Sequence, residues 1–146
     1  MTTIAVKDGV VATDSRVSQG GMVLDDKYDK RKVVDGVQFF VAGNVTDDAQ
    51  IIACYFEGAE IIEEIEGNPC ADFIIVDGSD VYYGGIEGAF WKMKLTTDTP
   101  YAIGSGAAYA IGAMDAGATA KEAVKIASRD VFTGGTVHSY KIKGRK

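Results

Sequence analysis

The residues best suited to chemistry stand at the start of the chain, which begins Met1-Thr2-Thr3-Ile4. Initiator methionine is usually removed before a residue as small as threonine, so we expect Thr2 to become the first residue. A threonine hydroxyl needs an adjacent base before it can act as a nucleophile near neutral pH. An N-terminal threonine carries that base itself, because its α-amine has a reference pKa of about 7.7–8.0. Thr2 is therefore a candidate nucleophile.

An amine of this kind is partly protonated at pH 7, so a working site needs groups that favour its neutral form. A buried lysine nearby lowers the amine's pKa by like-charge repulsion, and a carboxylate is needed to keep that lysine charged and in place. Acyl transfer also requires an N–H donor for the developing oxyanion. We expect these groups at strand ends and turns, where side chains from distant parts of the chain converge.

Three Asp-Gly pairs predict three β-hairpins, at Asp8-Gly9, Asp35-Gly36 and Asp77-Gly78. Each pair lies between runs of residues that favour strands, and both positions of such a turn need positive φ. Further strands are expected at 89–95 and 137–142. Together these features predict largely antiparallel sheet.

Three helices are predicted between and after these strands. Apolar residues at helical spacing follow Thr46-Asp47-Asp48 and predict a helix over 46–66. A small-residue helix is expected at 107–116, ended by Gly117. Thr119-Ala120-Lys121-Glu122 has the pattern of a capping box and predicts a helix that reaches Val131. This order of elements predicts a layered α+β architecture in one domain, residues 1–146.

The composition argues against several classes of protein. A net charge of −6 is unlike that of a nucleic-acid binder, which normally presents a basic face. No stretch approaches the ~20 apolar residues that span a membrane, and the N-terminus lacks the pattern of a secretory signal. Cys54 and Cys70 are too few and wrongly spaced for a zinc site. We therefore expect a cytoplasmic protein with no metal, no cofactor, no nucleic-acid partner and no membrane association.

Four blocks of the sequence resemble, in the same order, blocks of proteasome β-subunits and of the related peptidase HslV. They are TTIAVKDGVVATDSRVSQGG, FFVAGNVTDDAQ, YAIGSGAAYAIGAMDAG and SRDVFTGGTVHSYKI. The resemblance implies an endopeptidase of the N-terminal-nucleophile (Ntn) hydrolase superfamily. It also implies a four-layer α-β-β-α sandwich of two antiparallel sheets.

The resemblance assigns catalytic roles by position. Thr2 corresponds to the nucleophile and its α-amine to the general base. Asp14 corresponds to the aspartate that pairs with the active-site lysine, and Gly43 to the glycine whose N–H forms the oxyanion hole. A hydrogen-bonding trio around the amine corresponds to Ser105, Asp130 and Thr133. Taken singly, several of these are ordinary features of strand ends and turns, and it is their joint order that favours the enzyme.

The resemblance also suggests residues that contact substrate. Ser18 falls where a threonine commonly pairs with the substrate backbone. Val17, Val41 and Ala49 fall near positions that line the first specificity pocket. These residue types predict a preference for apolar substrate side chains.

Three lysines are candidates for the active-site lysine: Lys27, Lys30 and Lys32. Lys30 leaves Val34 at the apolar position that the family pattern requires. It also lies 13 residues before Gly43, one short of the usual interval. We therefore predict Lys30, the alternative being that all three belong to a solvated charged stretch.

The segment between Gly43 and Phe73 is shorter than in typical family members and has room for one helix where the family has two. We therefore expect one helical layer to be reduced. A thinned layer leaves apolar surface to cover, so we expect a homo-oligomer, which in the family is a ring. The resemblance alone implies an unfolded protein or peptide as substrate and an ATP-dependent unfoldase as partner.

Two other functions remain open from the sequence. One is a catalytically inactive structural or assembly subunit of the same fold. The other is an Ntn amidohydrolase that acts on a small amide, because the fold hosts such enzymes too.

Overall fold

The computed structural model describes residues 2–44, 46–96 and 99–144. Contacts divide the chain into two compact units. Unit 1 is Met1–Lys30 together with Thr97–Lys146, and unit 2 is Arg31–Thr96. Each unit is described by itself below, and the single domain expected from the sequence stays a prediction.

Unit 1 contains a four-stranded antiparallel sheet in the order β11-β1-β2-β12. Its strands are β1 (Thr3–Lys7), β2 (Val10–Thr13), β11 (Tyr101–Gly104) and β12 (His138–Lys141). Ala5 on β1 lies opposite Ala12 on β2 and Ala102 on β11. Paired residues of neighbouring strands point to the same face of a sheet, so the three alanines form a row on one face.

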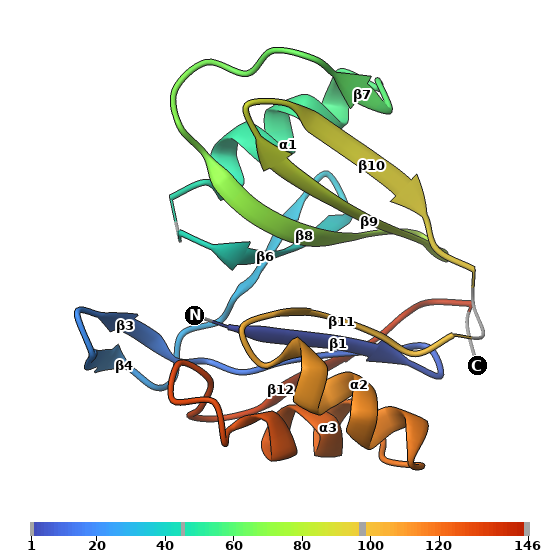
Figure 1. Ribbon diagram of the computed structural model, residues 1–146. Helices are drawn as coiled ribbons and strands as arrows, with labels where there is room; N and C mark the ends of the chain where they lie inside the picture. The colour runs from blue at the N-terminus through green and yellow to red at the C-terminus, as the bar shows by residue number, and fades with distance from the viewer. Residues whose placement is uncertain (1, 45, 97–98, 145–146) are drawn as a thin grey trace. The chain divides into compact units, whose positions relative to one another are not determined.

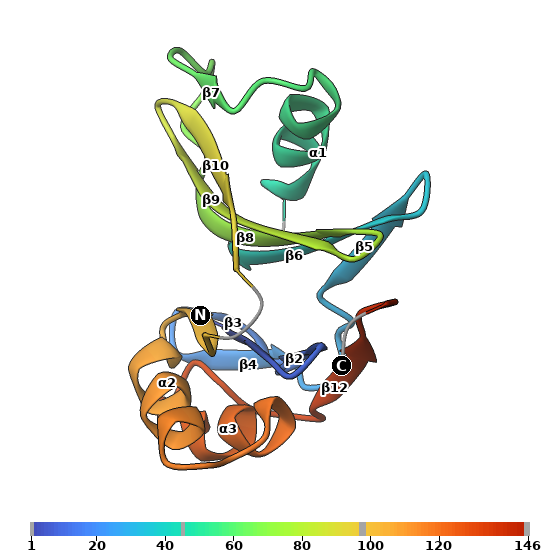
Figure 2. The same cartoon turned by 90° about the vertical axis from the view of Figure 1, so that its right-hand side faces the viewer.

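Helices α2 (Ala107–Asp115) and α3 (Ala120–Ala127) cover this row of alanines (Figure 1). Both views show the two helices on the same side of the sheet (Figure 2). The small side chains let the helices approach the strands closely. Lys7 extends from the same face as Ala5, and its Nζ donates to the carbonyls of Met114 (3.0 Å) and Ala118 (2.8 Å) at the end of α2. The Lys7 ammonium thus joins β1 to the end of α2 and to the turn that follows it.

The ends of these helices follow the sequence signals closely. Thr119 Oγ1 accepts from the Glu122 N–H at 3.1 Å, and the Glu122 carboxylate accepts from the Thr119 N–H at 2.9 Å, which confirms the capping box. Gly117, with φ of 112°, follows the end of α2 as predicted. The third helix ends at Ala127, so Val131 lies in the turn beyond it and is 70% exposed.

A two-stranded ribbon, β3 (Val17–Gln19) and β4 (Met22–Asp25), completes unit 1. It was not predicted from the sequence. The sequence feature that could have predicted it is the Gly20-Gly21 pair, whose φ values of 56° and 81° suit a two-residue hairpin turn.

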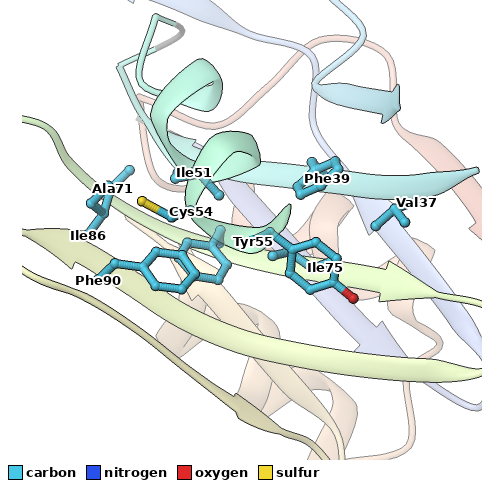
Figure 3. Packing of buried hydrophobic residues seen from close by; sticks show 10 residues of the cluster. Val37, Phe39, Ile51, Cys54, Tyr55, Ala71, Ile75, Ile86 and Phe90 are labelled. Atoms are coloured by element: carbon cyan, nitrogen blue, oxygen red, sulfur yellow. The ribbon is translucent and has the colours of Figure 1, made fainter. Parts of the chain in front are cut away.

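Unit 2 contains a six-stranded antiparallel sheet in the order β5-β6-β8-β9-β10-β7. The strands are β5 (Arg31–Val34), β6 (Val37–Gly43), β7 (Ile61–Ile62), β8 (Cys70–Asp77), β9 (Asp80–Glu87) and β10 (Phe90–Lys94). One helix, α1 (Asp48–Phe56), packs on this sheet. Its buried residues Ile51, Cys54 and Tyr55 meet sheet residues such as Phe39 and Phe90 in an apolar cluster (Figure 3).

The predicted helix over 46–66 was wrong in length. The helix ends at Phe56, because Gly58 adopts the left-handed conformation with φ of 82°. The apolar residues beyond it form strand β7, which pairs with β10. Asp47 stands at the N-cap, but its carboxylate accepts from the Cys70 N–H at 3.2 Å and makes no capping bond.

Two of the three predicted hairpin turns are confirmed. Asp8-Gly9 and Asp35-Gly36 both have positive φ at both residues. In the third hairpin Asp77 pairs with Asp80, so the turn residues are Gly78 and Ser79, one position later than predicted.

Among the described residues the chain is therefore a mixed α/β structure with three helices and antiparallel sheets. The four-layer sandwich stays a prediction. No helix in this part of the chain has both the length and the apolar character needed to cross a membrane.

Candidate active site

The register of β1 and β2 brings Thr2 and Asp14 to the same end of the sheet of unit 1. Ile4 pairs with Thr13, so the residue before β1 and the residue after β2 emerge together. The N–H of Asp14 continues the ladder by donating to the Thr3 carbonyl at 3.2 Å. The sequence places these two residues 12 positions apart, and the Asp8-Gly9 hairpin closes that interval.

The Thr2 hydroxyl lies between a carboxylate and an ammonium group. It donates to Asp14 Oδ1 at 2.7 Å, and it accepts a hydrogen bond from Lys30 Nζ. Lys30 Nζ also lies 2.8 Å from Asp14 Oδ1. All three residues are buried, with exposed fractions of 2% for Thr2, 0% for Asp14 and 8% for Lys30. The arrangement can therefore stabilise negative charge on the threonine oxygen, because burial strengthens the effect of the nearby cation.

Of the three candidate lysines, Lys30 is the one that meets Thr2 and Asp14. Lys27 is exposed, and Lys32 is an exposed residue of unit 2 whose Nζ lies 3.0 Å from Asp48 Oδ2. Burial lowers the pKa of the Lys30 ammonium, while the charge and hydrogen bond of Asp14 oppose that shift. The pKa of Lys30 therefore lies below its ordinary value, and Asp14 is the group that favours the protonated form.

Main-chain donors fix the Asp14 carboxylate. Its Oδ1 accepts from the Thr3 N–H at 3.1 Å. Its Oδ2 accepts from the N–H groups of Gly134 (3.0 Å) and Arg16 (3.4 Å). Sequence reasoning missed these three partners, because main-chain contacts leave little trace in side-chain types. The Gly134-Gly135 pair was the only signal.

The trio of Ser105, Asp130 and Thr133 forms one connected network. Ser105 Oγ donates to Asp130 Oδ2, and Thr133 Oγ1 donates to the same oxygen at 2.9 Å. Burial alone would raise the pKa of the Asp130 carboxyl. The hydrogen bonds from Ser105 and Thr133 lower that pKa and outweigh the effect of burial, so the pKa lies below its ordinary value. The carboxylate is therefore ionised near neutral pH.

This network contacts the first residues of the chain. Ser105 Oγ lies 3.4 Å from the Thr2 carbonyl oxygen, and Thr133 Oγ1 lies 2.7 Å from Thr3 Oγ1. Thr3 is a further site residue that sequence reasoning did not assign. Its signal was the second threonine of the Thr2-Thr3 pair.

Two glycines allow the turn that carries Ser105 to lie against the N-terminal strand. Gly104 has φ of 98°, and a Cβ there would stand 2.0 Å from the Thr2 carbonyl oxygen. A Cβ on Gly106 would stand 2.2 Å from Thr3 Oγ1. Both glycines of the Gly-Ser-Gly sequence are therefore required by close packing around Thr2 and Thr3.

Gly43 is the last residue of β6, in unit 2. A Cβ at this position would lie 2.6 Å from Ala71 Cβ and 2.7 Å from the Cys70 carbonyl oxygen. Packing between β6 and β8 thus requires glycine here. Packing within unit 2 therefore explains why residue 43 is glycine, and this explanation does not depend on any role of the Gly43 N–H in catalysis.

The predicted substrate-binding residues divide between the units. Val17 and Ser18 are half-buried on β3, where the register with β4 shifts between the two residues. In unit 2, Val41 is half-buried against the apolar cluster, and Ala49 is exposed on α1. The specificity pocket stays a prediction.

Within the described ranges, no group of three or more His, Cys, Asp and Glu side chains could hold a metal ion. The two cysteines are free thiols, Cys54 buried and Cys70 exposed.

The sequence matches no protein-family model and no curated protein. Among solved structures, one that matches is Thiobacillus denitrificans BPH in complex with epoxomicin. The TM-score is 0.64, the sequences are 19% identical, and the match covers 97% of this chain and 98% of that chain. At this identity the likeness is one of fold. The chain shares the fold of an epoxomicin-bound bacterial protein along almost its whole length.

Proposed function

We propose that this chain is an N-terminal-threonine endopeptidase of the proteasome β-subunit and HslV type, with Thr2 as its nucleophile. One observation carries the proposal: the buried Thr2 hydroxyl contacts both Lys30 Nζ and Asp14 Oδ1. The fold supports it independently, because a protein of the same fold has been solved with epoxomicin.

The proposed general base is the α-amine of Thr2, which removal of Met1 frees. The neutral amine takes the proton of Thr2 Oγ1 while this oxygen attacks the substrate carbonyl carbon. The resulting ammonium returns the proton to the leaving amine, and the acyl half stays on Thr2 as an ester. The amine then takes a proton from water, which attacks the ester and restores the hydroxyl.

Lys30 has two roles in this scheme. Its positive charge stabilises the Thr2 oxygen as negative charge develops, and it lowers the pKa of the nearby amine by repulsion. Asp14 keeps Lys30 charged and oriented. These roles agree with the buried contacts among the three residues.

The remaining roles follow the family resemblance. Ser105, Asp130 and Thr133 are proposed to bind and orient the amine, which agrees with their contacts to Thr2 and Thr3. Gly43 is the proposed oxyanion donor on the resemblance alone. Substrate binding is assigned in the same way to Val17, Ser18, Val41 and Ala49.

The resemblance also supplies the proposed assembly. The fold would be a four-layer α-β-β-α sandwich, and copies of the chain would form a ring that receives unfolded protein from an ATP-dependent unfoldase. Three consecutive apolar residues on β4, Met22, Val23 and Leu24, are exposed. Such a patch supports the proposed self-association, because apolar surface of this kind commonly lies in interfaces.

Intact-mass spectrometry of the purified protein, before and after incubation with epoxomicin, tests the proposal. We expect a chain without Met1 that gains one equivalent of epoxomicin, with the adduct on Thr2. Thr2→Ala should remain unlabelled, while Thr96→Ala, which changes an exposed threonine, should be labelled like the wild type.

The other outcomes separate the alternatives. A chain that keeps Met1 and takes up no epoxomicin would favour the inactive subunit. Labelling at Thr2 with turnover of small amides and none of peptides would favour the amidohydrolase.

A further inference from the structure

Arg16 and Asp26 form an ion pair in unit 1 that the proposed chemistry does not use. Arg16 Nε lies 2.8 Å from Asp26 Oδ1, and Arg16 Nη2 lies 3.1 Å from Asp26 Oδ2. Two parallel hydrogen bonds of this kind require the planar fork of arginine. The hydrogen bond from Arg16 lowers the pKa of the Asp26 carboxyl below its ordinary value. The guanidinium is therefore held in one orientation.

That orientation places the guanidinium against the turn formed by residues 131–135. Arg16 Nη1 donates to the Val131 carbonyl at 3.2 Å. The guanidinium also lies against Gly134, where a Cβ would stand 2.5 Å from Arg16 Cζ. Only glycine leaves room for this contact.

Main-chain bonds tie the same turn to the residues next to Arg16 and to Asp26. The Ser15 N–H donates to the Gly134 carbonyl at 3.1 Å, and the Thr136 N–H donates to the Asp26 carbonyl at 3.0 Å. Ser15 Oγ adds a hydrogen bond of 2.6 Å to the Asp26 carbonyl. Arg16, Asp26 and the turn are thus one connected piece of structure.

The turn delivers two groups to the Thr2 site. The Gly134 N–H donates to Asp14 Oδ2 at 3.0 Å, and Thr133 Oγ1 contacts both Thr3 Oγ1 and Asp130 Oδ2. A cavity of about 340 Å³ also borders the turn, and its lining includes Gly134, Gly135 and Lys125. On the side of the cavity the turn has open space beside it, so hydrogen bonds contribute to holding it in place.

We propose that Arg16 is a positioning residue, whose bidentate pair with Asp26 fixes the 131–135 turn so that Gly134 and Thr133 hold Asp14 and Thr3 in place. This inference rests on the proposed function. If the turn moves, Asp14 loses its Gly134 partner and can rotate away from Lys30. The Thr2 hydroxyl then loses the geometry of its two charged neighbours.

The partial exposure of the pair indicates how the effect should appear. The Asp26 side chain is 41% exposed and that of Arg16 is 23% exposed, so the pair contributes little to stability. The rate of a reaction depends far more strongly on the positions of the reacting groups, because a displacement of about 1 Å can lower the rate by about 10²-fold. The rate of reaction should therefore change far more than the stability.

The test uses the rate at which epoxomicin labels Thr2 at rising epoxomicin concentrations, which separates the maximal labelling rate from half-saturation. Asp26→Asn removes the charge and one acceptor, and Arg16→Lys keeps the charge but loses the fork. We expect both variants to lower the maximal rate by between about 10-fold and 100-fold, with half-saturation unchanged. Asp80→Asn, which removes the exposed pair with Lys94, is the matched control and should label like the wild type.

A second measurement needs no activity: hydrogen exchange at the Gly134 amide, followed by NMR. We expect faster exchange in both variants, because the amide loses its fixed acceptor. Labelling at the wild-type rate in both variants, or Gly134 exchange at the wild-type rate, would overturn the inference and leave the proposed function standing. Absence of labelling in the wild type would overturn the proposed function, and Gly134 exchange would then still decide whether Arg16 holds the turn.

Discussion

Lys30 and Asp14 form a buried ion pair in which Nζ lies 2.8 Å from Oδ1, and the Thr2 hydroxyl contacts both groups. A buried ion pair gives little net stability, because desolvation of the charges offsets their attraction. The pair is therefore better explained by what it does to the hydroxyl than by stability. The pair surrounds the Thr2 hydroxyl oxygen with one cation, Lys30, and one hydrogen-bond acceptor, Asp14.

The first prediction concerns Lys30. Lys30→Ala should lower hydrolysis and epoxomicin labelling by at least about 10²-fold, because a group that stabilises developing negative charge is worth about that much. Lys27→Ala changes an exposed lysine three positions away and should leave the rate unchanged. Wild-type rates in Lys30→Ala would remove this residue from the scheme.

Loss of folding must be distinguished from loss of chemistry in this variant. Lys30→Ala leaves the Asp14 carboxylate buried without its cation, which should reduce the free energy of unfolding by about 3–5 kcal/mol. Adding Asp14→Asn removes the unpaired charge and should restore part of that stability without restoring labelling. If labelling returned with stability, Lys30 would have only a structural role.

The second prediction is a pH dependence of stability that comes from Asp130. Its pKa in the folded chain lies below the ordinary value of about 3.9, so the unfolded chain binds the proton more readily. Its contribution to stability is therefore fully present above that ordinary pKa and is lost as the pH falls through the folded pKa. The unfolding free energy of the wild type minus that of Asp130→Asn should be largest above about pH 5 and should shrink on acidification.

Chemical denaturation across this pH range measures the difference. Asp115→Asn, which changes an exposed carboxylate, controls for the loss of one negative charge. A difference that grew on acidification would contradict the direction of the Asp130 shift.

How far the sequence determines the fold depends on whether the signal is local. The turns at Asp8-Gly9 and Asp35-Gly36 and the capping box at Thr119 were predictable, because a few neighbouring residues decide them. The helix predicted over 46–66 was too long. Its helical spacing continued to Ile62, but Gly58 ended the helix, and Ile61 and Ile62 form β7, which pairs with β10. Spacing alone cannot report such a long-range pairing.

The same distinction applies to the site. The family resemblance selected Thr2, Asp14 and Lys30, and the structure brings these three residues into contact. The contacts of Thr3 with Thr133 and of Gly134 with Asp14 were missed, since each joins residues more than 100 positions apart. Residue types in the sequence indicate which side chains can react. The contacts that hold those side chains in place depend on how the backbone folds, so the sequence does not indicate them.

The third prediction tests the capping box at the start of α3. Thr119→Ala removes the acceptor for the Glu122 N–H and should reduce the free energy of unfolding by about 1 kcal/mol. Lys121→Ala changes an exposed residue of the same helical turn and should have little effect. Epoxomicin labelling under native conditions should be unchanged in both, because the cap contacts no site residue. Unchanged stability in Thr119→Ala would contradict the assigned cap.

The fourth prediction uses one substitution, glycine to alanine, at two positions where the structure demands opposite signs. Gly43→Ala would place its Cβ 2.6 Å from Ala71 Cβ and 2.7 Å from the Cys70 carbonyl, so β6 and β8 must shift. We expect a loss of about 1–3 kcal/mol in unfolding free energy, as for other overpacked sites. Adding Ala71→Gly should recover only part of the lost stability, because the clash with the Cys70 carbonyl remains.

Gly112→Ala in α2 is the contrasting substitution. Its Cβ meets nothing within 4 Å, so it should stabilise the chain by about 0.5–1 kcal/mol. Equal effects at the two positions would contradict the packing of β6 on β8. A loss of activity in Gly43→Ala that accompanies the expected destabilisation would report strand displacement, so it would be no evidence for an oxyanion role of the Gly43 N–H.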